Sequence, residues 1–452
     1  MQKKKYERPS IKKIESDMPN KFGMRSEYQP MTHIDGVAVK DIIKNYGSPV
    51  FVISEKTIRK TFKDAMRAFT TRYPKVQYAW SYKTNYLSAV CNVFHQEGSW
   101  AEVVSRFEYD KAIGNGVPAN KIIFNGPDKT RKDLEKAIKN QSLIHIDHLD
   151  EYYTILEIAE MTNIRPQVAI RVNMDTGIYP MWDRFGFNYE NGQAWDALNK
   201  IMMSKKMDLV GLHCHIGTYM MTAEPYGVAA AKLADLAVGL QQKYNHYIKY
   251  IDMGGGFASK NTLKGAFLPG SDTNPSFDDY AEKITSAIIN SNISPEHIPF
   301  LFLESGRAMI DDAGYLIGTV IANKRSSTGK RTTILNIGVN ILFTSFWYQH
   351  KITPAQEFTH HTENTMIYGP LCMNIDVIRE NVELPLLNAG DNVVIHQVGA
   401  YNMTQWMQFI TLRPYVVMVS EKAEISVIRK GETMSSISDY EVIPQHLKDF
   451  KL

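Results

Sequence analysis

The sequence predicts an α/β fold, in which a (β/α)8 TIM barrel is followed by a second, mainly β domain of the β-sandwich or β-barrel type. From residue 76 to about 305, short apolar stretches alternate with amphipathic stretches of helical period, the pattern of parallel βαβ units. Eight such apolar stretches occur, which is the strand number of the barrel. After about residue 312, strand-like segments follow one another with few long helical patterns between them.

The order of these stretches favours the barrel over a doubly wound open sheet. The turn after the first predicted strand reads KTNY and lacks a glycine-rich dinucleotide fingerprint. Helical patterns such as 128–140 and 227–244 lie between strands. We expect barrel strands at 76–83, 101–105, 121–126, 143–147, 167–173, 209–216, 250–256 and 299–305.

Three units are expected along the chain. An N-terminal tail and lead-in occupies 1–35, the barrel 36–312 and the β domain 313–452. Residues 332–343, 391–401 and 414–420 read as strands of the β domain. The segment 37–54 can contribute a helix and a strand to either domain, so that choice stays open.

Composition excludes several classes of protein. A formal charge of +3 over 452 residues is too small to indicate a nucleic-acid binder. Six Lys or Arg residues lie in the first thirteen without an apolar stretch behind them, which predicts a flexible tail and no signal peptide. No apolar run approaches the ~20 residues of a membrane span. Three cysteines cannot form a disulfide framework, which predicts a cytoplasmic location.

The carboxyl ends of the predicted strands form a candidate active-site mouth, because barrel enzymes carry their chemistry there. A polar residue or glycine closes every strand. One or two such residues would be ordinary strand exits, but eight with such varied chemistry favour a functional site. They are Lys83, Ser105, Asn125, Asp147, Asn173, His215, Gly254–Gly256 and Glu304.

Four of these features together indicate pyridoxal 5'-phosphate. A lysine can bond covalently to the cofactor aldehyde. The glycine run can bring backbone N–H groups close to a phosphate. His215 can stack on a flat ring, and Glu304 can keep the pyridine nitrogen protonated, so that the ring accepts electrons. His213 and His215 share a strand face and could also hold zinc, but no third ligand can be assigned, so no metal is expected.

From about residue 36 to 420, the chain resembles the fold-type III pyridoxal-phosphate-dependent decarboxylases, which include diaminopimelate, ornithine and arginine decarboxylases, and it is most similar to the diaminopimelate enzymes. Six motifs occur in family order: WSYK, HCHIGT, DMGGGF, ESGR where the family usually has Glu-Pro-Gly-Arg, GPLC and GAY. The resemblance implies a carboxy-lyase that acts on an amino acid as a homodimer with shared active sites.

The resemblance also implies residue roles. Lys83 would bond the cofactor, His215 would stack on its ring, and Glu304 would pair with the ring nitrogen. Arg307 would bind a substrate carboxylate or the phosphate, and Cys372 would act as proton donor across the dimer interface. The residues expected around the phosphate are Thr218, Gly254, Gly255, Gly256 and Tyr401, and those expected at the substrate are Arg307, Tyr348, Met373 and Tyr401.

The chain departs from this pattern where the far end of the substrate would bind. Met373 stands where the diaminopimelate and ornithine enzymes have an acid, and a thioether is a poor acceptor for an ammonium. Thr344 stands where diaminopimelate enzymes have an arginine, although Tyr348 is kept. Asp376 matches a later family aspartate and is no obvious substitute. These departures predict altered specificity.

Three other functions remain as alternatives. Diaminopimelate decarboxylase itself is the nearest alternative. A racemase of the same fold is disfavoured by Glu304, because alanine racemases place an arginine at that position. A non-catalytic pyridoxal-phosphate-binding protein is disfavoured because such proteins resemble the barrel alone, whereas this chain keeps Cys372 and Tyr401 in a β domain.

Overall fold

The computed structural model describes residues 29–358 and 361–448. The basic first thirteen residues, expected to form a flexible tail, lie outside the described residues. Within the described ranges, no helix combines the length and the apolar character that crossing a membrane requires.

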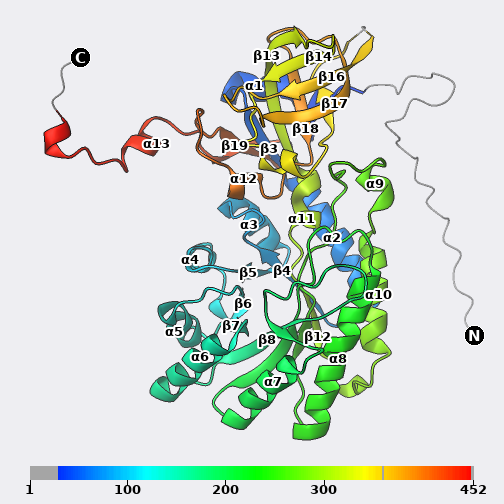
Figure 1. Cartoon of the computed structure of the whole chain (residues 1–452), viewed down its shortest axis with the longest axis vertical. Coiled ribbons are helices and arrows are strands. Elements are labelled where there is room, and N and C mark those ends of the chain that lie inside the picture. Colours follow the sequence, from blue (N-terminus) through cyan, green and yellow to red (C-terminus); the bar gives the residue numbers. More distant parts are fainter. Residues whose placement is uncertain (1–28, 359–360, 449–452) are drawn as a thin grey trace, which may run out of the picture.

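Eight parallel strands form a closed barrel, so the predicted TIM barrel is confirmed (Figure 1). The pairing of β12 with β4 and of β8 with β10 completes the ring. Each strand overlaps a predicted range, because strands buried on both faces are recognisable as apolar runs. The strands are β4 (Val76–Ser81), β5 (Trp100–Val103), β6 (Ile122–Phe124), β7 (Leu143–Ile146), β8 (Gln167–Asn173), β10 (Asp208–His213), β11 (Tyr250–Asp252) and β12 (Phe300–Leu303).

Helices surround this barrel. The helix α2 (Glu55–Thr70) precedes the first barrel strand, yet it packs against both α10 and α3 and so fills the eighth helical position. Capping boxes begin α5 at Thr130 and α10 at Ser276, which satisfies backbone N–H groups that would otherwise lack partners. The other barrel helices are α3 (Ser88–Gln96), α4 (Arg106–Gly114), α5 (Arg131–Lys139), α6 (Leu149–Thr162), α7 (Gln193–Ser204), α8 (Glu224–Tyr244) and α10 (Phe277–Ile289).

A second, mixed sheet lies beyond the barrel (Figure 1). Its main path runs in the order β17-β16-β14-β13-β3-β19-β20, and β18 joins β13 to β15. The strands are β13 (Gly314–Arg325), β14 (Arg331–Leu335), β15 (Ile352–Pro354), β16 (Thr362–Tyr368), β17 (Val377–Pro385), β18 (Asn392–His396), β19 (Tyr415–Val419) and β20 (Ile425–Arg429).

The N-terminal segment contributes to this sheet and not to the barrel. The strand β3 (Val50–Ser54) pairs antiparallel with β13 and parallel with β19. The helix α1 (Val39–Tyr46) precedes it, and its Val39 and Ile42 pack in one apolar cluster with Val50 and Val52. Residues 39–54 therefore lie with the β domain, which is one of the two placements that the sequence left open.

Short elements complete the fold. The helix α11 (Arg307–Ile310) connects the barrel to β13, and α13 (Ser435–Ser438) lies on an arm that leaves the body of the molecule (Figure 1). The remaining pieces are β1 (His33–Ile34), β2 (Val37–Ala38), β9 (Phe187–Asn188), α9 (Gly270–Thr273), α12 (Asn402–Gln405) and 3-10 turns at Ala119–Lys121, Pro295–His297, Asp311–Ala313, Phe343–Phe346 and Gln445–Leu447.

Candidate active site

Lys83 lies just beyond the end of β4 and is paired with a buried carboxylate. Its Nζ donates to Glu102 Oε2 at 2.7 Å, and Glu102, which is fully buried, also accepts from Ser81 Oγ at 2.5 Å. The Lys83 side chain is 38 % exposed, although its ammonium end lies among buried groups. Burial acts to lower the pKa of Lys83, but Glu102 and then Glu304 outweigh burial and raise it. Lys83 is therefore held in the barrel mouth and is not a simple strand exit.

Glu304 follows β12 and faces the same interior. It is 4 % exposed, and the Asn125 amide donates to Glu304 Oε1 at 2.7 Å and to Glu102 Oε1 at 3.1 Å. One amide thus fixes both carboxylates. At the end of β11, burial and the charge of Glu304 raise the pKa of Asp252 well above its ordinary value, so this carboxyl keeps its proton.

The glycine run after β11 brings bare backbone to the site. Gly254 and Gly256 have φ of 63° and 92°, in the left-handed region that favours glycine. A Cβ at Gly255 would lie 2.6 Å from the Glu304 carbonyl oxygen, so that position also excludes a side chain. Asp252 Oδ1 accepts the Gly254 N–H at 2.8 Å, while the Gly256 N–H has no partner in the described part of the chain. The loop can therefore offer an N–H group to an anion.

His215 presents a neutral ring beside this loop. Its Nδ1 accepts the Gly255 N–H at 3.1 Å, which orients the imidazole. Burial, and after it the charges of Arg171 and Lys83, lower the pKa of His215 well below its ordinary value. The Trp182 ring lies 5.6 Å from it, centroid to centroid. A neutral, oriented imidazole can stack on a flat cofactor.

Arg307 begins α11 and is 7 % exposed. Its Nη1 donates to the Tyr348 hydroxyl and its Nη2 donates to Thr218 Oγ1 at 3.2 Å. The Tyr401 ring centroid lies 4.5 Å from its Cζ. Arg307 forms no ion pair within 4.0 Å among the described residues, and Asp311 interacts with its charge only from beyond that distance. Its guanidinium therefore remains open to an anionic ligand.

Tyr401 reaches the barrel from the β domain because its loop is tied there. The Tyr401 N–H donates to the Thr84 carbonyl oxygen at 2.9 Å, one residue after Lys83. The Ala400 N–H donates to Asp311 Oδ1 at 3.1 Å. Lys83, Thr218, His215, the glycine run, Glu304, Arg307, Tyr348 and Tyr401 are thus brought together in one chain.

Cys372 and Met373 are not brought to this group. Both lie in the loop between β16 and β17, where Cys372 is exposed and Met373 packs partly against the core. Asp376 cannot replace the missing acid, since its two oxygens accept the N–H groups of Val339 and Leu371, each at 2.8 Å.

Thr344 is likewise committed to local bonds. It is 1 % exposed, its Oγ1 donates to Asn402 Oδ1 at 2.9 Å, and it lies 2.8 Å from His350 Nε2. A side chain in this position serves the packing of the β domain and supplies no charge to a ligand.

Sequence reasoning missed Glu102, the closest partner of Lys83. The signal was a lone carboxylate inside an otherwise apolar strand, AEVV, where a charge is costly unless it is paired. Asn125 was recognised as a strand end, but its bridging of two carboxylates depends on the barrel geometry.

A cavity of about 580 Å³ lies at the opposite end of the barrel. It is lined by residues at the amino ends of the strands, among them Lys75, Trp100 and Phe300. None of the groups described above contacts it, so it is not the site of the chemistry.

The carboxyl-end group fits pyridoxal phosphate on structural grounds. The lysine at the barrel end suits the cofactor's aldehyde, and the neutral imidazole suits the face of its ring. The glycine loop suits its phosphate, and the buried carboxylate suits its ring nitrogen. Comparison with known proteins agrees. Residues 57–311 match the family described as "Pyridoxal-dependent decarboxylase, pyridoxal binding domain".

Individual relatives are similar over nearly the whole chain. A diaminopimelate decarboxylase of Methanocaldococcus jannaschii is 28% identical over 432 residues, covering 92% of this chain and 95% of the relative. The Bacillus subtilis diaminopimelate decarboxylase is 27% identical and covers 89% and 93%. The crystal structure of a diaminopimelate decarboxylase from M. jannaschii superimposes with a TM-score of 0.84 at 27% identity, over 92% of this chain and 96% of that one. The family match spans more than half of this chain, which therefore belongs to the pyridoxal-dependent decarboxylases, with pyridoxal phosphate as its cofactor.

Proposed function

We propose that this protein decarboxylates an amino acid whose far end carries a carboxylate or amide and no second ammonium, in active sites shared between the subunits of a homodimer. One observation carries the specificity: Met373 and Thr344 supply no charge, whereas buried Arg307 forms no ion pair among the described residues and feels the charge of Asp311 only from beyond ion-pair distance. A second ammonium on the substrate would have no carboxylate of the protein to pair with, whereas a second carboxylate could pair with Arg307.

The residues of the barrel end would hold the cofactor. Lys83 would carry it, the neutral His215 ring would stack on it, and Glu304 would face its ring nitrogen. The residues that would hold its phosphate are Gly254, Gly255, Gly256, Thr218 and Tyr401. When bound, pyridoxal phosphate supplies an electron sink for the bond that loses carbon dioxide.

Cys372 would return a proton to the reacting carbon from the second subunit. Its side chain is exposed on the β16–β17 loop and contacts none of the Lys83 group within one chain. A head-to-tail dimer would bring this loop to the partner's barrel mouth, which makes two equivalent sites by symmetry.

Diaminopimelate decarboxylase remains a second candidate, because the relatives named above carry that activity in their names. One similar structure is a diaminopimelate decarboxylase in complex with L-lysine. If this chain has the same activity, another side chain must supply the contacts that Met373 and Thr344 do not.

The deciding measurement is a set of specificity constants for diaminopimelate, lysine, ornithine, arginine and glutamate-like compounds, from carbon dioxide release. Each missing charged hydrogen bond is worth roughly 1.5–3 kcal/mol, or about 10–100-fold in kcat/KM. Diaminopimelate should therefore be the poorer substrate by orders of magnitude. A preference for diaminopimelate would refute the altered specificity while leaving the decarboxylase class intact.

Variants sharpen this test. Met373→Glu should raise kcat/KM for diaminopimelate, and Ile375→Glu, which puts the same charge on a 59 % exposed position of the same loop, is the matched control. Thr344→Arg is added last, because Thr344 is buried and hydrogen-bonded and the larger side chain must displace those bonds.

A further inference from the structure

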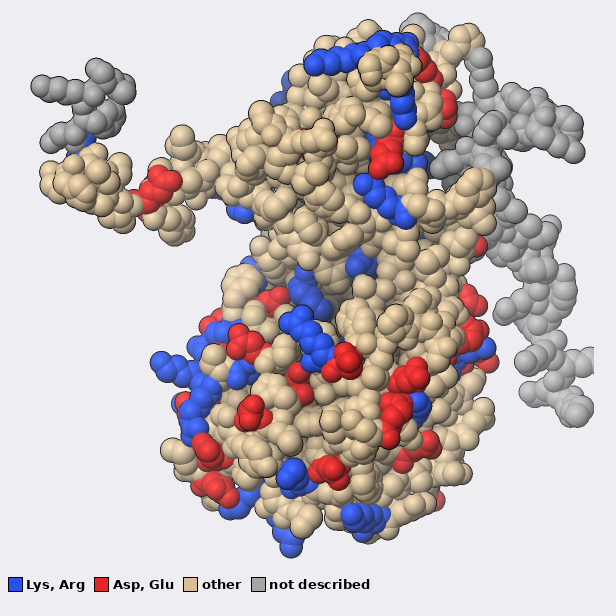
Figure 2. Space-filling view, in the orientation of Figure 1, with Lys and Arg blue, Asp and Glu red and all other residues tan. Residues whose placement is uncertain are grey.

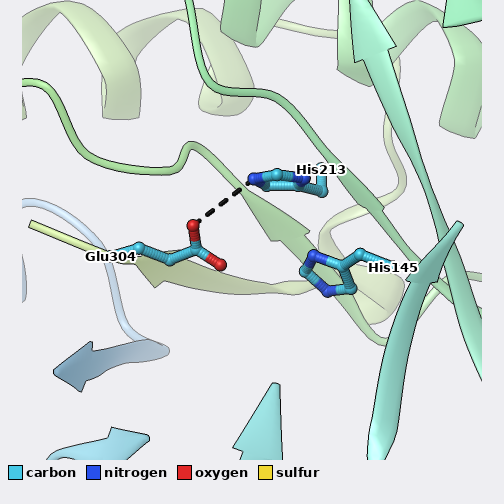
Figure 3. A group of neighbouring side chains, drawn as sticks. All are labelled: His145, His213 and Glu304. Atoms are coloured by element: carbon cyan, nitrogen blue, oxygen red, sulfur yellow. Dashed lines mark ion pairs between the residues drawn. The ribbon is translucent and has the colours of Figure 1, made fainter. Parts of the chain in front are cut away.

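A line of buried polar side chains leads from Glu304 across the interior of the barrel. His213 on β10 places Nε2 3.4 Å from Glu304 Oε2. The ring of His145, on β7, lies 4.6 Å from the His213 ring at 35°. His145 Nε2 in turn lies 2.9 Å from the Tyr250 hydroxyl on β11. Figure 3 shows the two imidazoles and the carboxylate turned toward one shared space.

These imidazoles lack ordinary partners. Both ring nitrogens of His213 and Nδ1 of His145 are buried without a hydrogen-bond partner among the described residues. Each residue is 1 % exposed. Leaving such groups unpaired is costly, so a cluster of them at one place calls for a functional or structural reason.

Both rings are neutral in this environment. Burial first, and then the charge of Arg171, lower the pKa of His213 well below its ordinary value. Burial and the neighbouring His213 do the same to His145. Burial also raises the pKa of Tyr250, which keeps its proton and can donate it to His145 Nε2. His145 then carries its proton on Nδ1, on the side of His213, and His213 can carry its own on Nε2, toward Glu304.

We propose that His213, backed by His145 and Tyr250, is a positioning residue: when the cofactor binds, its Nε2–H, unpaired here and 3.4 Å from Glu304 Oε2, turns onto that oxygen, while the Asn125 amide holds the other carboxylate oxygen. The inference rests on the proposed role of Glu304 at the cofactor's ring nitrogen. Two neutral donors would fix the carboxylate in place without neutralising it, so its charge stays directed at the ring.

A bound metal ion is the competing explanation, because ligand atoms of His145, His213 and Glu304 lie within 4.8 Å of one another. Burial is the main cause that disfavours a protonated His213, and the charges of Arg171, Lys83 and Lys129 add to it against the opposing charge of Glu102. These nearby cations also disfavour a dication. A metal would also occupy the carboxylate that the cofactor needs.

The test uses the holoenzyme with His213→Leu and His213→Gln, and measures the absorption spectrum of the bound cofactor, its dissociation constant, kcat and KM. His213→Leu removes the donor and should lower kcat by about tenfold with little change in KM, the loss expected for one hydrogen bond to a charged group. It should also alter the cofactor spectrum. Glutamine keeps an N–H donor and should restore most of both. His145→Gln and Tyr250→Phe should have smaller effects in the same direction.

Controls separate the possible failures. His297→Gln, at an exposed histidine stacked on Tyr247, should change nothing. Glu304→Gln should change the spectrum and kcat strongly. An unchanged spectrum and kcat in Glu304→Gln would show that the proposed role of Glu304 is wrong. If Glu304→Gln has the expected effect but folded His213→Leu and His213→Gln both behave like the unmodified enzyme, only the positioning role of His213 is overturned. Stoichiometric metal in the purified protein, lost in His213→Gln and His145→Gln, would also overturn the proposal.

Discussion

The carboxyl end of the barrel and the β16–β17 loop carry different parts of the predicted chemistry. The side chains of the barrel end contact one another within one chain, whereas those of the loop do not reach that group. At the barrel end, Lys83 pairs with Glu102, and Asn125 holds two carboxylates. In the loop, Asp376 is buried and hydrogen-bonded, but Cys372 is exposed and Ile375 is 59 % exposed.

The two regions differ because the barrel end must be rigid, whereas the β16–β17 loop must be accessible. A cofactor needs groups fixed before it binds, and the barrel strands supply that rigidity. The proposed role of Cys372 in a second subunit requires that its side chain remain on the surface of its own chain. Figure 2 shows the barrel and the β domain as two lobes with lysine and arginine side chains in the hollow between them.

The largest effect should come from removing the group at the centre of the rigid region. Lys83→Ala should lower carbon dioxide release by more than about 10³-fold, because the covalent route is lost. Lys83→Arg keeps the charge beside Glu102 but cannot bond the aldehyde, so it should be equally inactive. Borohydride treatment followed by mass spectrometry should place the cofactor on Lys83 in the unmodified enzyme only. An adduct on another lysine would refute the assignment.

A mixing experiment tests whether the exposed loop serves the partner subunit. Equal amounts of inactive Lys83→Ala and Cys372→Ala protomers should regain about a quarter of full activity, because half of the randomly paired dimers contain one intact site. Mixing Lys83→Ala with Lys83→Arg should regain none. Heterodimers that form without activity would count against shared sites.

The smallest effect concerns Asp311, which ties the Tyr401 loop to the barrel. Burial raises the pKa of Asp311 to about 6 from an ordinary value of 3.8. Because the folded state binds this proton more tightly, the stabilisation is full below about pH 4 and is lost as the pH rises to about 6. As the pH rises through that range, the free energy of unfolding of Asp311→Asn should increase by roughly 1–3 kcal/mol relative to that of the unmodified protein. Urea unfolding at several pH values measures this difference. Plots of unfolding free energy against pH that run parallel for the two proteins would contradict the prediction.

The sequence alone predicted the barrel and most of the groups at its mouth for a simple geometric reason. Parallel strands end at the same edge, so Lys83 and Glu304 could be expected together although they are far apart in sequence. In the structure, Glu102 and Asn125 link them. Glu102 was missed because it lies inside a strand, where alternation between faces, and not strand order, decides which side chain points inward.

Comparison of motifs was weakest where local hydrogen bonds in the fold decide what a side chain can do. The amino-acid sequence does not show that Asp376 accepts two N–H groups or that Thr344 is hydrogen-bonded to Asn402. The assignment of β3 was undecidable for a related reason, since its pairing partners β13 and β19 lie hundreds of residues away and leave no local pattern.

That placement of β3 has a consequence for synthesis. All five residues of Val50–Ser54 are buried between β13 and β19, yet β19 is among the last strands to leave the ribosome. At 5–20 residues per second, the apolar segment VFVIS waits on the order of 20–70 s for its parallel neighbour. During that time it presents an open edge to other nascent chains, so a stop codon shortly before Tyr415 should leave a chain that aggregates even though its barrel is complete.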